Sequence, residues 1–126
     1  MTLIYKLQRT CVASYLAAVA LQIYVMGLAL FGVTSFMPHA MLGYAMIVGA
    51  LILMVLTVTA KLPRRAQLFA AAVLVLTLLQ PVLVLTLRGR APALAALHPV
   101  NALIIFAFAA MVARTTARPS SPLPVP

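Results

Sequence analysis

The chain has 126 residues, 66% of them hydrophobic, and carries nine Lys or Arg residues but no Asp or Glu. A soluble domain of this size could not keep so much apolar surface from water, so the composition predicts a membrane protein. Without carboxylates the chain can build no Asp/Glu acid–base pair, no carboxylate metal site and no acidic proton relay. The single cysteine, Cys11, excludes an intrachain disulfide and a cysteine-based zinc site.

The basic residues occur in short clusters between long apolar runs. A nucleic-acid-binding protein needs a basic patch on a folded surface, whereas clusters at the ends of apolar runs are typical of contacts with lipid headgroups. We therefore expect the lipid bilayer as a partner and no nucleic acid.

The first apolar run covers about residues 10–33 and follows Lys6 and Arg9. It is too long for the apolar region of a signal peptide, so it predicts an uncleaved first transmembrane helix. Gly27 and Gly32 are small residues of the kind that permit close helix approach in membranes.

Three further spans follow, at about 39–60, 66–87 and 92–113. Pro38 and Pro92 each suit the first positions of a helix. Residues 1–114 thus predict one domain with four transmembrane helices. The proline-rich residues 115–126 predict a disordered cytoplasmic tail.

Four spans place the chain termini and the loop at 61–65 on one side of the membrane. That side holds seven basic residues: Lys6, Arg9, Lys61, Arg64, Arg65, Arg114 and Arg118. The other side holds only Arg88 and Arg90. Because basic residues favour the cytoplasmic side, the pattern predicts an all-α, integral membrane four-helix bundle with both termini cytoplasmic, in the inner membrane of a bacterium.

Among the polar residues of the expected spans, His39, Gln80, His98 and Asn101 fall in the outer half and Gln22 lies nearer mid-depth. Polar side chains cannot find partners in hydrocarbon, so these should point inward and meet one another. The stretch Leu97-His98-Pro99-Val100-Asn101 is the most polar of these segments.

His39 and His98 are the only histidines, and they lie on the second and fourth spans. One imidazole from each of two facing helices is what bis-histidine ligation of haem b needs. Gly43 and Ala102, one turn beyond each histidine, would leave room for a flat macrocycle. Arg88 and Arg90 could pair with the haem propionates, and Gln22, Gln80 and Asn101 could support the site.

The spacing also leaves other interpretations open. His39 begins its span, whereas His98 lies about six residues inside its own, which implies a depth mismatch of several ångströms at about 1.5 Å per residue. The histidines could instead only hydrogen-bond and hold the bundle together, or a quinone could bind near His98.

No catalytic constellation is visible, so the chain is not expected to be an enzyme on its own. A non-catalytic accessory or assembly subunit of a larger membrane complex is the alternative function, with membrane protein partners or a homo-oligomer. A transporter is disfavoured because no intramembrane carboxylate could couple transport to protons.

Over about residues 8–114 the chain resembles a family of small, functionally uncharacterised four-helix bacterial membrane proteins. The resemblance rests on Gln22 with Gly27, His39-x-x-x-Gly43, Gln80-Pro81 and the motif from Leu97 to Ala102, with Met26 where the family pattern has a small residue. It implies a four-helix membrane fold and no established activity.

The placement of the two histidines is also distantly similar to that in four-helix membrane cytochromes b and in each half of haem A synthase. That similarity covers two residues and a topology, and it implies haem binding without implying a particular reaction.

Overall fold

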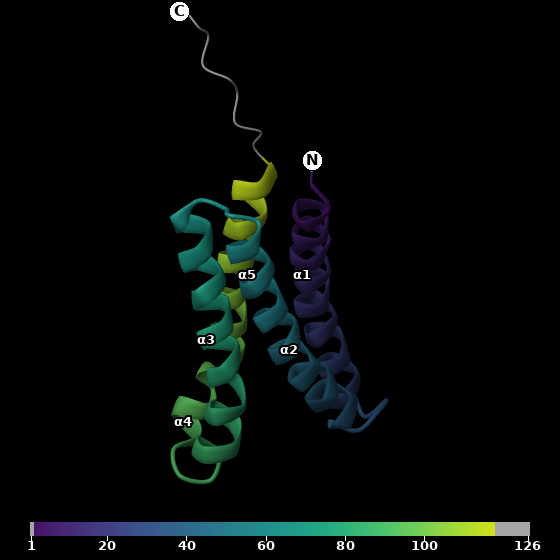
Figure 1. Ribbon diagram of the computed structural model, residues 1–126. Coiled ribbons are helices and arrows are strands. Elements are labelled where there is room, and N and C mark those ends of the chain that lie inside the picture. Colours follow the sequence, from purple (N-terminus) through teal and green to yellow (C-terminus); the bar gives the residue numbers. More distant parts are fainter. Residues whose placement is uncertain (1, 118–126) are drawn as a thin grey trace, which may run out of the picture.

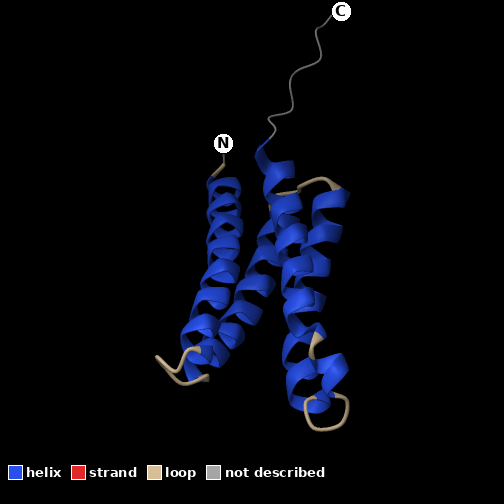
Figure 2. Cartoon of the chain, turned by 180° about the vertical axis from the view of Figure 1, so that it is seen from behind, coloured by secondary structure: helices blue, strands red, loops and turns tan. Residues whose placement is uncertain are grey.

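The computed structural model describes residues 2–117, and almost all of them are helical. The helices are α1 (Leu3–Leu30), α2 (Met37–Thr59), α3 (Arg64–Leu87), the short α4 (Pro92–Ala95) and α5 (Leu97–Ala117). No strand occurs within these residues, so the predicted all-α class is confirmed (Figure 2).

Four segments of this part of the chain are long and apolar enough to cross a membrane: α1, α2, α3, and α4 together with α5. In these segments only 17–22% of the residues in the most apolar window are buried inside the molecule. The remaining apolar side chains face outward, where only lipid could cover them. The predicted membrane bundle is therefore confirmed by length, composition and burial.

The helices form two antiparallel hairpins, α1–α2 and α3–α5, which pack against each other (Figure 1). Between the hairpins, the backbones of α2 and α3 and those of α1 and α5 approach closely, while the diagonal pairs α1/α3 and α2/α5 meet only through side chains. The hairpins diverge toward the end that carries the loops at residues 31–36 and 88–91 (Figures 1 and 2).

Small and β-branched side chains fill the core where the four helices meet. Ala50, Ala70 and Ala109 are fully buried, beside Val12 and Val73. Small residues let helix backbones approach closely, which favours association in lipid, where no hydrophobic driving force exists between helices.

The turn inside the first hairpin and the turn that joins the two hairpins have backbone features typical of helix C-termini. After α1, the N–H of Val33 donates to the carbonyl of Leu28, and Gly32 adopts a φ of 73°. After α2, Lys61 takes the same left-handed role with a φ of 51°. Such residues satisfy carbonyls that the helix leaves unpaired.

The expected close packing at Gly27 and Gly32 was wrong. A Cβ atom added at either glycine would meet nothing within 4 Å. Gly32 follows the end of α1, and the glycines that face α1 from α2 are Gly49, where a Cβ would lie 3.5 Å from the Tyr15 ring, and Gly43. Hydropathy alone does not tell which face of a helix a glycine occupies.

The fourth span is not one helix, as the sequence had suggested, because it breaks at Ala96 between α4 and α5. Pro99 explains the break, since a proline ring clashes with the carbonyl four residues earlier, and that residue is Ala95, the last of α4. Pro99 itself then lies in the first turn of α5, where proline is tolerated.

The helix ends also differ from the expected spans. α1 begins at Leu3, so Lys6 and Arg9 lie within its first two turns, and α5 continues through residues 115–117. The remaining residues of the predicted disordered tail, 118–126, lie outside the described part of the chain.

Replacing Ala109 by Leu should destabilise the bundle, because its side chain is fully buried between helices. We expect the free energy of unfolding to fall by about 1–3 kcal/mol through overpacking. Unfolding by SDS in detergent micelles measures it. Ala107→Leu, at an exposed position of the same helix, is the matched control and should leave stability nearly unchanged. Equal effects of the two substitutions would contradict this packing.

Candidate functional site

His39 and His98 come together at the diverging end of the bundle, although they lie on the diagonal helices α2 and α5. Their ring centres are 6.0 Å apart, with the ring planes at 66°. Both side chains are half-buried. The two histidines therefore bridge the space between the hairpins, and each hairpin supplies one imidazole.

Each ring is held by the backbone of its own hairpin. The Nδ1 atom of His39 lies 3.2 Å from the carbonyl oxygen of Gln22 on α1, and that of His98 lies 3.4 Å from the carbonyl oxygen of Gln80 on α3. A carbonyl can only accept, so these contacts place the proton on Nδ1 in both rings. Nε2, on the far edge of each ring, is then the lone-pair nitrogen.

The depth mismatch expected between the two histidines does not keep their rings apart, since the ring centres are 6.0 Å from each other. Because the fourth span breaks at Ala96, His98 is the second residue of α5, and His39 is the third residue of α2. Both imidazoles therefore project from the first turn of a helix, at matching positions in the two hairpins.

Gln22 and Gln80 each contribute a second, unpaired group. The side-chain Oε1 atoms of both residues are buried and lack a hydrogen-bond partner among the described residues. The amide of Gln22 lies against Gly43, where an added Cβ would be 3.1 Å from Nε2. Thus the room that Gly43 leaves is taken by Gln22 rather than left open. Unpaired buried acceptors are costly, and Gln8 nearer the opposite end of the bundle holds a third one.

Asn101 supports the site indirectly. Its Nδ2 donates to the carbonyl oxygen of Leu76 on α3 at 2.8 Å, and the side chain is buried. Asn101 makes no hydrogen bond to His98. Because Leu76 lies one turn before Gln80, the Asn101 bond aligns α5 with α3 next to the His98 contact.

The remaining expected site residues lie nearby but make no specific contact. Ala102 is half-buried, one turn beyond His98 on α5. Arg88 and Arg90 are exposed in the turn between α3 and α4, at the end of the bundle that carries the histidines.

Two further polar pairs inside the bundle were not anticipated from the sequence. The hydroxyl of Tyr15 donates to Thr77 at 2.6 Å, since Thr77 uses its own proton on the carbonyl of Val73. Nearer the opposite end, Gln8 contacts Thr57, and both are fully buried. A threonine in an apolar span does not by itself predict a hydrogen bond to another helix, because its hydroxyl can bond to its own helix.

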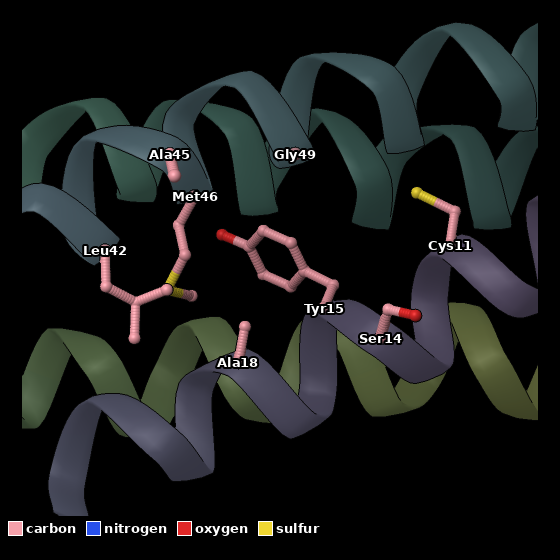
Figure 3. Close-up of a pocket in the computed structure, with 8 residues that line it drawn as sticks. All are labelled: Cys11, Ser14, Tyr15, Ala18, Leu42, Ala45, Met46 and Gly49. Atoms are coloured by element: carbon pink, nitrogen blue, oxygen red, sulfur yellow. The ribbon is translucent and has the colours of Figure 1, made fainter. Parts of the chain in front are cut away.

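An apolar groove of about 220 Å³ lies between α1 and α2, away from the imidazoles. Figure 3 shows Tyr15 projecting from α1 between Cys11 and Met46. The lining residues are Cys11, Ser14, Tyr15, Ala18, Leu42, Ala45, Met46 and Gly49. The groove brings together no set of acid–base or metal-binding groups.

Replacing Asn101 by Leu should weaken the alignment of α5 on α3. We expect the free energy of unfolding in micelles to fall by about 1 kcal/mol, the scale of interhelical hydrogen bonds in membranes. Val100→Leu, at the exposed neighbouring position, is the control and should change little. A stability unchanged by Asn101→Leu would contradict a stabilising role of the bond.

Comparison with known proteins agrees with the resemblance noted in the sequence. A family model described as a family of unknown function (DUF6220) matches residues 22–87, just over half of the 126 residues. The match includes Gln22, His39 and Gln80 and ends before His98. No curated protein and no solved structure gives a significant match. The chain, a four-helix membrane protein, thus belongs to DUF6220, a family of unknown function.

Proposed function

We propose that the protein binds haem b between α2 and α5, with His39 and His98 as the axial ligands. The spacing of the two rings carries this proposal. Imidazoles on opposite faces of one metal have ring centres roughly 6 Å apart, because each metal–nitrogen bond is about 2 Å long and each ring centre lies about 1 Å beyond its nitrogen. The observed separation is 6.0 Å.

The hydrogen bonds of the rings support the same function. Histidines that bind a metal usually donate their second ring N–H to a carbonyl or carboxylate, which fixes the tautomer and the ring orientation. The carbonyls of Gln22 and Gln80 accept from Nδ1 in this way. The chain's own part is thus to hold each Nε2 as a ligand before the cofactor arrives.

The small number of ligands favours haem over a bare metal ion. Within residues 2–117, no three side chains of His, Cys, Asp or Glu come together. A porphyrin brings four nitrogens of its own, so two protein ligands complete its iron. Arg88 and Arg90, at the same end of the bundle, would provide positive charge for the propionates. When bound, haem b supplies one-electron redox chemistry.

Purified protein from haem-supplemented cells should show a Soret band with a low-spin spectrum. His39→Ala and His98→Ala should each lower the bound haem by more than about tenfold, because each removes an iron ligand. Absorption spectra and a pyridine haemochrome assay measure the haem content.

Met37→Ala is the matched control, because Met37 is exposed two residues from His39 and its thioether is the other axial ligand type in this region. This variant should keep its haem. Wild-type protein without a Soret band would contradict haem binding and favour the alternative, a non-catalytic accessory subunit of a larger membrane complex.

The proposed location of the protein is the inner membrane of a bacterium, with both chain termini on the cytoplasmic side. One end of the bundle carries Lys6, Arg9, Lys61, Arg64, Arg65 and Arg114, and within residues 2–117 the end with the histidines carries only Arg88 and Arg90. The basic end favours the cytoplasmic side, so the imidazoles lie near the outer surface.

Single-cysteine labelling tests this orientation. In a Cys11→Ser background, the Arg90→Cys variant should react with a membrane-impermeant maleimide in intact spheroplasts. The Arg64→Cys variant should react only after lysis. Both positions are exposed turn or helix-start sites. The reverse pattern would show the opposite orientation.

A further inference from the structure

The buried positions of the first hairpin recur in the second at a constant spacing. In the N-terminal two thirds of α1, the buried residues are Gln8, Val12, Tyr15 and Val19. Adding 58 to each number gives the four buried residues at the start and middle of α3: Ala66, Ala70, Val73 and Thr77. The same shift carries Gln22 onto Gln80.

The second helix of each hairpin follows the same rule with a shift of 59. The buried residues of α2 are Met46, Ala50, Leu53 and Thr57. Their counterparts on α5 are also buried: Ile105, Ala109, Val112 and Thr116. This shift carries His39 onto His98 and Gly43 onto Ala102.

The helix contacts obey the symmetry that such a repeat requires. A twofold rotation about an axis along the bundle exchanges α1 with α3 and α2 with α5. It therefore exchanges the α2–α3 contact with the α5–α1 contact, and both are present, whereas the backbones of neither diagonal pair approach closely. Parallel repeats about an axis along the membrane normal are a known way to build membrane proteins.

Together, the two shifts place the histidine and glutamine of the first hairpin onto those of the second. His39 bonds through Nδ1 to the carbonyl of Gln22, and His98 does the same with Gln80. Both glutamines bury an unpaired Oε1. The contact of the two rings, at 6.0 Å, thus lies on the pseudo-twofold axis.

We infer that the chain is two copies of one histidine-bearing hairpin, and that they present equivalent imidazoles to opposite faces of one iron, closing both of its axial positions. The second part rests on the proposed haem-binding function. Because no coordination position stays open, the site suits electron transfer and does not bind a small exogenous ligand at the iron.

The two copies differ at positions where the repeat has diverged. Phe69 and Phe108 pack together on α3 and α5 with ring centres 5.7 Å apart. Their counterparts are Cys11 and Gly49, which line the groove between α1 and α2. Asn101 corresponds to Leu42, so only the second hairpin has the bond to Leu76.

Ligand binding to the haem-loaded protein tests the closed site. Carbon monoxide added to the reduced wild-type protein should leave the spectrum unchanged. His39→Ala and His98→Ala, supplied with haem during purification, should each bind carbon monoxide, since either substitution opens one axial position. A spectrum of the wild type that shifts with carbon monoxide, or a low-spin spectrum that survives one of the two substitutions, would overturn the inference while leaving haem binding intact. Wild-type protein with no Soret band would overturn both the closed site and the proposed function.

Equivalent substitutions in the protein without haem test the repeat separately. Ala50→Leu and Ala109→Leu occupy matching buried positions, as do Thr57→Val and Thr116→Val. Within each pair the melting temperature in micelles should fall in the same direction and to a similar extent, within about a factor of two. Val48→Ala, at an exposed position of α2, is the control and should change it little. A large loss from one member of each pair and none from the other would overturn the duplication.

Discussion

Lipid hydrocarbon offers no partner to a polar side chain, and this constraint organises the interior of the bundle. Polar contacts occur at successive depths: Gln8 with Thr57, Tyr15 with Thr77, Asn101 with the carbonyl of Leu76, and finally the histidines with the carbonyls of Gln22 and Gln80. Most of these bonds join helices, so they also set the helix register. In hydrocarbon such bonds stabilise by only about 0.6 kcal/mol on average, and they act together with close packing of small residues.

Three buried side-chain oxygens are the exceptions to this rule among the described residues: those of Gln22 and Gln80, and that of Gln8 nearer the opposite end. Each unsatisfied acceptor is a cost that packing does not explain. Two of the three lie in the residues whose carbonyls hold the imidazoles. Unpaired acceptors and imidazoles thus lie together only where the hairpins diverge.

Pro99 has a larger structural effect than its position in an apolar run suggests. By ending α4 at Ala95, it allows α5 to start at Leu97 and brings His98 into the first turn of its helix. The second hairpin then matches the first, in which Pro38 opens α2 one residue before His39. A helix break before α5 and a helix start at α2 thus place equivalent imidazoles on the two sides of the pseudo-twofold axis.

The sequence by itself determined the membrane class, the number of spans and the inward direction of the polar residues, because hydrocarbon imposes length and hydropathy on any chain that crosses it. It also singled out His39 and His98, since they are the only histidines. Tertiary structure alone decided their separation, because a helix break depends on which carbonyl a proline ring meets. The helix pairing likewise decided that Gly43 lies against Gln22 and that Gly27 lies against nothing. Hydropathy records how apolar a residue is, and only packing determines which neighbour it faces.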